Sequence, residues 1–460
     1  MTGLTVQYGT FVAGLASGAI LVPDDCTALI KTGIADAVGV MLAGIDEPIT
    51  QKLRDVLPKG GPESTILMGT EKRGAFDAAF INGAATHALD YDDVTMRGHT
   101  STVLVPAIFA EAEALGSTGA QMIAAYMAGY EIWADLAYRD AGQIQHKGWH
   151  PTGVLGAISA AAACAVLRGL DAERATHAIA IGASQAGGLL ANFGTMTKPF
   201  HAGRSAASGV LSARLAEAGM TGSPDAIEHD QGFLKAISPE NDVDRSTPAD
   251  HLGRDWRMRR YGISVKKYPV CYCGHRATDA ILQIMRDHSI DPAQIASIDT
   301  FTSDLHAMTL RNARPQTGLE AKFSMQFDMA AGVLAGKVGL AELTDAFVQR
   351  ADVQALMAKV SVTASVDYDP DLPGYNRADR VTVTLNDGSV IEGLPVTRAT
   401  GHADLPLGPS ELWTKFADCA AAAGWAEARA RRLYDALMAL DAAPGIAAIL
   451  AQAQAVPEPA

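Results

Sequence analysis

Residues 153–167 read Gly-Val-Leu-Gly-Ala-Ile-Ser-Ala-Ala-Ala-Ala-Cys-Ala-Val-Leu and include no charged side chain. A helix of this composition has no polar face to turn toward water, so other elements must surround it. The stretch is interrupted by Ser159 and is shorter than the roughly 20 apolar residues that span a membrane. It therefore predicts a helix at the centre of a soluble helical core.

Helical patterns continue on both sides of this stretch. Pro23-Asp24-Asp25 is a typical helix start, and apolar residues then follow at helical spacing. Many of the other segments begin after Thr, Ser, Asp or Pro and end at Gly. The predicted helices cover residues 75–90, 104–115, 119–138, 172–187 and 203–218.

The pattern changes after Tyr261, where alternating apolar residues predict strands at 296–302, 359–368 and 380–385. The last of these runs into Asn386-Asp387-Gly388, which predicts a hairpin with a second strand at 389–393. Helices are expected between the strands at 277–288 and 319–334, and the chain becomes helical again over 410–452. The sequence thus predicts a mostly α protein, with a large all-α helical domain (1–262 and 400–460) and a smaller α+β lid domain (263–399).

Composition limits the partners and the compartment. The chain has 460 residues, too many for one ordinary core, and its formal net charge is −14. A negative surface repels nucleic acid and anionic membranes, so neither is expected as a partner. Five scattered cysteines suggest no disulfide framework, and the first residues lack the basic segment of a signal peptide. We therefore expect a cytoplasmic protein.

The first motif that could carry chemistry is His87-Ala88-Leu89-Asp90-Tyr91-Asp92-Asp93, followed shortly by His99. Three carboxylates in four positions repel one another, so a protein rarely buries them together without a reason. A solvated helix end with a capping Asp is the plain alternative. The functional interpretation places Asp90, one turn from His87, in a pocket that also receives His99.

Two further segments carry candidate residues. His150 precedes Pro151 and a helix start, a loop position that often holds site residues, although a lone His there is ambiguous. Lys198 lies in the polar turn between two apolar helices, where burial would need an anionic partner. A surface lysine is the plain alternative for Lys198.

The segment from Lys266 to His275 contains Cys271-Tyr272-Cys273-Gly274-His275, which resembles part of a zinc site. No second Cys/His pair lies at ligand spacing nearby, so no metal is predicted. A segment that faces the substrate, with Lys266 as its cation, fits the residues better. The sequence also lacks a Walker loop, a Gly-x-Gly-x-x-Gly, a His-Glu-x-x-His and a Gly-x-Ser-x-Gly motif.

Taken together, these segments resemble the MmgE/PrpD family, which contains 2-methylcitrate dehydratases, cis-aconitate decarboxylases and iminodisuccinate epimerases. The resemblance implies an all-helical domain, an α+β lid domain, a homodimer, and a site between the domains that needs no cofactor. The matching stretches follow the family order and span most of the chain: Asn82-Gly83 through Asp93, Gly98-His99, His150-Pro151, Thr197-Lys198-Pro199, Lys266 to His275, Ala321 to Ser324, Gly401-His402 and Pro406.

The same resemblance assigns the site residues. It implies catalytic roles for Asp90, His99, His150, Lys198 and Lys266, and substrate contacts for Tyr91, Cys271 and His275. Decarboxylases of the family tend to have Thr where Val94 stands and His where Cys271 stands. These departures argue against decarboxylation of the itaconate-forming type.

The expected chemistry is removal of a proton next to a carboxylate of a di- or tricarboxylic acid. Dehydration of the 2-methylcitrate dehydratase type is our first expectation, because it is the family's best-represented reaction; epimerisation and decarboxylation are the alternatives. Lys198 and Lys266 would hold the substrate carboxylates, and His150 would act as base or acid with Asp90 and His99 beside it.

Two interpretations from other classes stay open. Asp90-Tyr91-Asp92-Asp93 matches the Asp-x-Asp-Asp motif of protonating terpene cyclases, although only 6% of residues are aromatic, too few to line a carbocation pocket well. A non-catalytic helical scaffold is the other, and it predicts that the polar candidates lie far apart.

Overall fold

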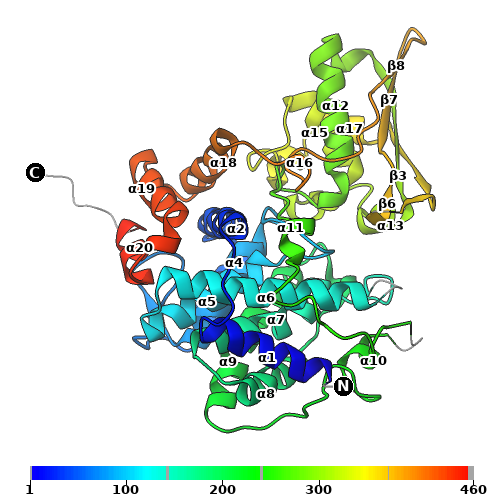
Figure 1. The fold of residues 1–460 in the computed structure, drawn as a ribbon. Helices are drawn as coiled ribbons and strands as arrows, with labels where there is room; N and C mark the ends of the chain where they lie inside the picture. The colour runs from blue at the N-terminus through cyan, green and yellow to red at the C-terminus, as the bar shows by residue number, and fades with distance from the viewer. Residues whose placement is uncertain (1–2, 141–143, 239–241, 371, 454–460) are drawn as a thin grey trace, which may run out of the picture. The chain divides into compact units, whose positions relative to one another are not determined.

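The computed structural model describes residues 3–140, 144–238, 242–370 and 372–453. The chain divides into two compact units (Figure 1). The first unit comprises Met1–Asn192, Met196–Ser264 and Gly408–Ala460, and the second comprises Phe193–Thr195 and Val265–Leu407. Helices dominate the described residues, which confirms the mostly α class.

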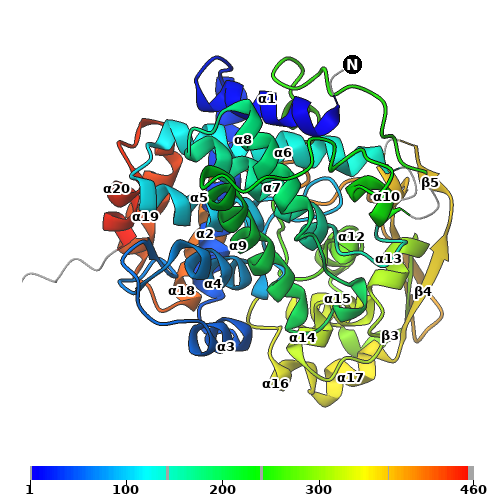
Figure 2. The same cartoon turned by 90° about the horizontal axis from the view of Figure 1, so that it is seen from below.

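The centre of the first unit is helix α7 (Pro151–Leu167), in which every residue is buried. Its Ala-rich surface lets other helices approach on all sides, as its uncharged sequence predicted. Figure 2 shows α7 among its neighbours. The helices that pack against it include α5 (Ser101–Leu115), α6 (Gly119–Arg139), α8 (Ala172–Ala183) and α9 (Thr197–Glu217).

Helices α4 (Ala75–Ala88) and α9 approach each other closely through two glycines. A Cβ atom on Gly203 would lie 2.3 Å from the carbonyl oxygen of Phe80, and one on Gly83 would lie 2.9 Å from the Cα of Gly203. Neither position can hold a larger residue without moving the helices apart. This contact matters for the site, because His87 lies in the last turn of α4 and Lys198 in the first turn of α9.

The C-terminal segment returns to the first unit. Helix α18 (Pro409–Ala422) packs on α2 (Asp24–Ala43), near the start of the chain. Helix α2 is long and apolar enough to cross a membrane, but 67% of its most apolar stretch is buried inside the protein, as in a core helix. The remaining elements of this unit are α1 (Leu4–Ala16), α3 (Pro48–Val56), α10 (Phe233–Ile237), α11 (Arg257–Tyr261), α19 (Glu427–Met438), α20 (Ile446–Ala453), and the strands β1 (Ser64–Thr65) and β2 (Lys72–Arg73).

The second unit contains a four-stranded sheet in the order β4-β3-β7-β8. Strand β3 (Ile295–Ser303) pairs in parallel with β4 (Val360–Ser365) and antiparallel with β7 (Arg380–Leu385). Strand β8 (Val390–Glu392) completes the predicted hairpin with β7. The other elements are α12 (His275–His288), α13 (Asp304–Thr309), α14 (Gly318–Ala321), α15 (Met325–Ala335), α16 (Asp345–Val348), α17 (Ala351–Met357), β5 (Tyr368–Asp369) and β6 (Leu372–Asn376).

Several predicted elements were too long, and three differ most. The helix expected at 319–334 is two helices, because Ser324 has an extended backbone and its side chain accepts a hydrogen bond from the Phe327 amide to begin α15. The strand expected at 359–368 ends at Ser365, and the helix expected at 172–187 ends at Ala183. The lid role of the α+β unit and the expected domain boundaries stay predictions.

Candidate active site

The first part of the candidate site is a buried turn that follows helix α4. His87 lies in the last turn of α4, and the chain then reverses through residues 89–93. Asp90 has a φ of 51°, a left-handed conformation that Asp tolerates better than most residues. His87, Asp90 and Asp92 are each at most 2% exposed. The turn is therefore no solvated helix end.

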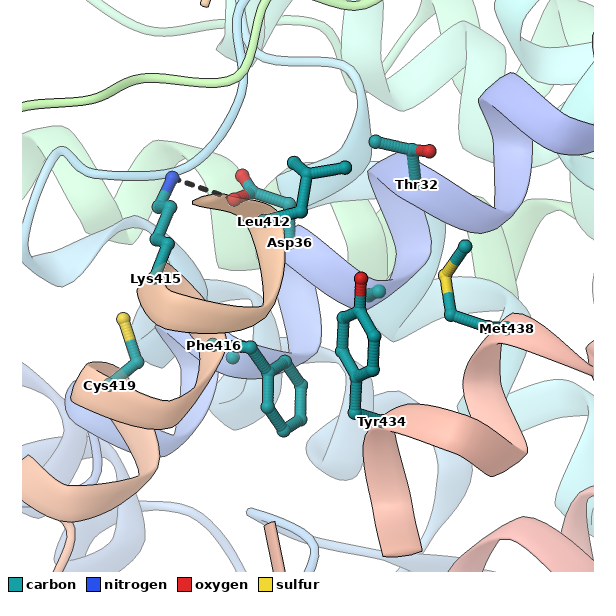
Figure 3. A pocket seen from close by; sticks show the side chains of 10 residues that line it. Thr32, Asp36, Leu412, Lys415, Phe416, Cys419, Tyr434 and Met438 are labelled. Atoms are coloured by element: carbon teal, nitrogen blue, oxygen red, sulfur yellow. Dashed lines mark ion pairs between the residues drawn. The ribbon is translucent and has the colours of Figure 1, made fainter. Parts of the chain in front are cut away.

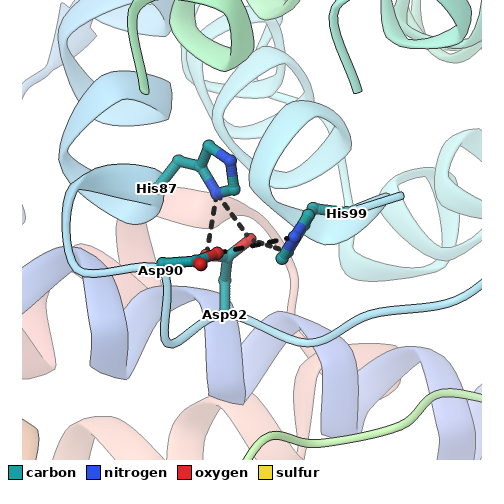
Figure 4. A group of neighbouring side chains, drawn as sticks. All are labelled: His87, Asp90, Asp92 and His99. Atoms are coloured by element: carbon teal, nitrogen blue, oxygen red, sulfur yellow. Dashed lines mark hydrogen bonds and ion pairs between the residues drawn. The ribbon is translucent and has the colours of Figure 1, made fainter. Parts of the chain in front are cut away.

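Asp92 contacts two histidine rings (Figure 4). His87 places Nδ1 2.9 Å from Asp92 Oδ1, and His99 places Nδ1 2.8 Å from Asp92 Oδ2. Burial raises the pKa of Asp92, but the two rings outweigh burial and hold that pKa well below its usual range. An ionised Asp92 favours the tautomer of each ring with its hydrogen on Nδ1. In His99 this turns Nε2 toward Asp90, whose Oδ1 lies 3.6 Å away.

Lys198 supplies the positive charge of the group. It lies in the first turn of α9 and donates a hydrogen bond from Nζ to Asp90 Oδ1 over 2.7 Å. Both side chains are buried, so the ion pair is largely shielded from water. Burial of a lysine is costly without an anionic partner, and Asp90 is that partner.

His150 forms the N-terminal end of α7 and contacts a second histidine. Its Nδ1 lies 3.1 Å from Nδ1 of His201, one turn after Lys198 on α9. Burial, followed by the charge of Lys198, holds the pKa of His150 well below its usual range. The same two causes lower the pKa of His201 to about 4. Both rings are therefore neutral at physiological pH, and one donates its Nδ1 hydrogen to the other.

The structure thus brings four of the sequence-predicted residues, Asp90, His99, His150 and Lys198, into one buried group of the first unit. The ring of His87 lies between the others, 4.5 Å from His99 and 5.8 Å from His150, centroid to centroid. Burial lowers the pKa of His87 to about 3, although Asp92 opposes the shift. This arrangement argues against the rival interpretation of a non-catalytic helical scaffold, which predicted that the polar candidates lie far apart.

Three members of the group, His87, Asp92 and His201, were not predicted as site residues, although the sequence analysis noted His87 one turn from Asp90. Asp92 lies in the acidic motif Asp90-Tyr91-Asp92-Asp93. Only the structure shows that Asp92 is the carboxylate of this motif that contacts both histidine rings. His201 follows Lys198 by three positions, and on a helix that spacing places both side chains on one face. The sequence prediction started this helix at Gly203, whereas the helix begins at Thr197. Lys198 and His201 were therefore not recognised as neighbours on one helix face.

The predicted residues Lys266, Cys271 and His275 lie together in the second unit. Lys266 donates a hydrogen bond from Nζ to the carbonyl oxygen of Val270 over 3.1 Å, and His275 Nε2 lies 3.3 Å from the same oxygen. All three are buried, and Cys271 donates its backbone N–H to the carbonyl of Lys322. Their roles in catalysis and substrate binding stay predictions.

Tyr91 has its ring against helix α18. The ammonium of Lys415 lies 4.0 Å from the centroid of the ring. Burial raises the pKa of the Tyr91 phenol above its usual range, and the nearby Cys419 and Asp36 add to the rise. The predicted contact of Tyr91 with substrate stays a prediction.

The group in Figure 4 also has the composition of a metal site, since His87, Asp90, Asp92 and His99 each offer one ligand atom within 4.8 Å of the others. Two imidazoles and two carboxylates suit zinc. Asp92, however, already contacts both rings at hydrogen-bond distances, and Lys198 already neutralises Asp90. A bound ion would have to replace these contacts.

Comparison with known proteins identifies the family of this chain. A model of the MmgE/PrpD N-terminal domain matches residues 7–246, and a model of the MmgE/PrpD C-terminal domain matches residues 268–440. The chain belongs to the MmgE/PrpD family. The family resemblance seen in the sequence is thereby confirmed.

Several curated relatives carry the name cis-aconitate decarboxylase. The human protein is 29% identical over 354 residues, which cover 74% of this chain and 71% of the relative. The Aspergillus terreus protein is 25% identical over 480 residues, which cover 98% of this chain and 95% of the relative. These relatives support a lyase-type activity for this member of the family.

Proposed function

We propose that this protein is a lyase that moves a proton at the carbon next to a carboxylate of a di- or tricarboxylic acid, most simply a hydro-lyase of the 2-methylcitrate dehydratase type. The observation that carries the proposal is the buried Lys198–Asp90 ion pair surrounded by histidines, of which His150 is held neutral. A cation and a neutral base close together are the two groups that such a proton abstraction needs.

The difficulty of the reaction lies in the weak acidity of a carbon next to a carboxylate. Removal of its proton builds negative charge on the carboxylate oxygens, and a fixed cation in a water-poor site stabilises that charge. Lys198 is the candidate cation. His150, neutral because its pKa is lowered, is the candidate base that takes the proton.

Dehydration then needs a proton for the departing hydroxyl group. We assign this proton to His99, because Asp92 stands behind its ring and stabilises the charged imidazolium. His150 takes the hydrogen from the α-carbon, the C–O bond on the neighbouring carbon breaks, and His99, which starts this step as the imidazolium, passes a proton to the leaving oxygen. The products are an alkene and water, and the charge on the two histidines balances.

Decarboxylation is the second candidate, because the named relatives are cis-aconitate decarboxylases. The same cation would stabilise the carbanion left by CO2, and a histidine would protonate it. Val94 and Cys271 stand where family decarboxylases tend to have Thr and His, which favours dehydration. Epimerisation would use the same proton abstraction with return of the proton to the opposite face.

Proton NMR in D2O distinguishes the three outcomes. The purified protein is incubated with EDTA and a panel of citrate-like acids, aconitates and substituted succinates. An alkene and water formed from a hydroxy acid identify dehydration, loss of a carboxylate identifies decarboxylation, and deuterium at an α-carbon whose configuration is inverted identifies epimerisation. A panel without any exchange or product contradicts the proposal, and activity that EDTA removes contradicts its metal-independent form.

Replacement of Lys198 tests the cation directly. Lys198→Met should lower kcat/KM by about a hundredfold or more, because the developing charge loses its stabilising partner. Lys52→Met, at an exposed lysine of α3, is the control and should leave the rate unchanged. A Lys198→Met variant with a wild-type circular dichroism spectrum and wild-type turnover would show that Lys198 is not the cation.

A further inference from the structure

The turn that carries Asp90 and Asp92 is held from a distant part of the chain. Lys415 of helix α18 donates a hydrogen bond from Nζ to the backbone carbonyl of Tyr91 over 2.7 Å. Its ammonium also lies 4.0 Å from the centroid of the Tyr91 ring. Tyr91 stands between the two site carboxylates, so a single lysine contacts the central residue of the turn through both backbone and side chain.

Lys415 is itself fixed by Asp36 of helix α2. Lys415 Nζ lies 2.6 Å from Asp36 Oδ1, and Figure 3 shows the two side chains pointing toward each other. Both side chains are at most 6% exposed. The space between them and their neighbours measures about 10 Å³, about the size of one water molecule, so it is no site for a substrate.

The charges around Lys415 are arranged to hold one ammonium. Burial raises the pKa of Asp93, and the neighbouring Asp36 adds to the rise, so Asp93 favours its neutral form. Burial also raises the pKa of Asp36, but Lys415 opposes that rise, so the Lys415 ammonium faces Asp36 as its carboxylate partner. A buried lysine in this balance has little freedom to move away from the turn.

A simple structural ion pair between α2 and α18 would need no contact with the turn. Lys415 makes that contact, and the turn needs restraint because Asp90 has a left-handed backbone with a φ of 51°. We infer that Lys415, anchored by Asp36, is a positioning residue that fixes the turn 89–93 so that Asp90 meets Lys198 and Asp92 meets the histidines. This inference rests on the proposed function for its effect on turnover.

The test compares four variants. Lys415→Met removes the donor, Lys415→Arg keeps one, and Asp36→Asn/Lys415→Met removes both charges so that no buried charge is left unpaired. Lys31→Met is the matched control, because Lys31 also links α2 to the C-terminal segment, through Asp441 at 2.9 Å, without contacting the turn. Steady-state kinetics and thermal unfolding are measured for each.

We expect kcat to fall at least tenfold in Lys415→Met, with KM within about twofold of the wild type, because the turn orients the reacting groups. Lys415→Arg should restore most of kcat, and Lys31→Met should leave it unchanged. Asp36→Asn/Lys415→Met should fold and still turn over slowly. If the double variant folds and has the wild-type kcat, the inference is wrong. This holds even if Lys415→Met alone does not fold.

A second measurement separates this inference from the proposed function. The imidazole signals of His87 and His99 are recorded by NMR on 13C-histidine-labelled protein without substrate. They should shift in the double variant and stay in place in Lys31→Met, even if no acid on the panel is a substrate. Unchanged signals in the folded double variant overturn the positioning role, whereas shifted signals with an inactive wild type overturn only the proposed reaction.

Discussion

Burial and the charge of Lys198 set the pH range in which His150 can act as a base, and the contact with His201 adds to their effect. A base must be neutral, and burial and Lys198 lower the pKa of His150, with smaller contributions from His87 and His201. The neutral form of a histidine persists down to its pKa. The acid limb of the kcat/KM profile should therefore lie well below pH 6.5, the value for a free imidazole.

His201→Gln tests this assignment. The variant removes the ring that packs against His150 and helps to lower its pKa, and it also removes the partner of its Nδ1, so the acid limb should move to higher pH. We expect kcat to fall about tenfold, equivalent to about 1.4 kcal/mol in the barrier. His229→Gln, at a half-exposed histidine, is the control. An acid limb that stays in place in His201→Gln would mean that His201 does not act through His150.

The sequence predicted candidate site residues but not the contacts between them. Asp90, His99, His150 and Lys198 were recognised from motifs, and the structure gathers all four. The pairing of Asp92 with two histidines could not be predicted, because neighbouring acidic residues in a turn differ only in the direction that the backbone gives them. Lys415 carries no motif at all, and its contact with Tyr91 joins residues 324 positions apart.

The geometry of the site depends on how closely α4 and α9 approach. Gly203→Ala would place a Cβ 2.3 Å from the carbonyl oxygen of Phe80 and should force the helices apart. We expect the free energy of unfolding to fall by about 1–3 kcal/mol. Turnover should fall as well, because His87 lies in the last turn of α4 and Lys198 in the first turn of α9. Urea unfolding and kcat measure the two effects.

A second glycine of α9 provides the comparison. Gly209→Ala would place its Cβ 2.3 Å from the Cβ of Ala160 on α7, about three turns from Lys198. Its loss of stability should be similar, but its loss of kcat should be smaller. Equal losses of kcat in both variants would show that the α4–α9 contact has no special role in placing the site.

Helices and strands were predicted best where tertiary contacts agree with the local pattern. The hairpin at Asn386-Asp387-Gly388 formed as expected, because Asp387 accepts a hydrogen bond from the Ser389 amide and Gly388 adopts a φ of 84°. The predicted helix over 319–334 failed at Ser324, where a cap interrupts an otherwise helical pattern. Apolar spacing alone does not show such a break.

The return of the C-terminal segment to the first unit was predicted from its helical pattern, but its exact limits were not. The units divide at Ser264/Val265 and at Leu407/Gly408, whereas the sequence placed the boundaries of the predicted domains at 262/263 and 399/400. The second unit has a hydrophobic core of its own, formed mainly by α12, α15, α17 and the sheet. Composition changes too gradually at the crossings to mark them in the sequence.

These crossings suggest a test of the first unit as an independent fold. A Cβ on Gly401 would lie 2.1 Å from the carbonyl oxygen of Val265 and 3.5 Å from Leu407 Cγ, so the two ends of the inserted segment lie close together. Replacement of residues 266–406 by a short Gly/Ser linker should therefore leave a helical protein that melts cooperatively. A chain that ends at residue 407 should not, because α2 loses Lys415 as the partner of Asp36 and Phe416 as the side chain over Gly39. The measurement is a circular dichroism melt of each chain. A cooperative transition in the truncated chain, with none in the linked chain, would show that the C-terminal helices do not belong to the core of the first unit.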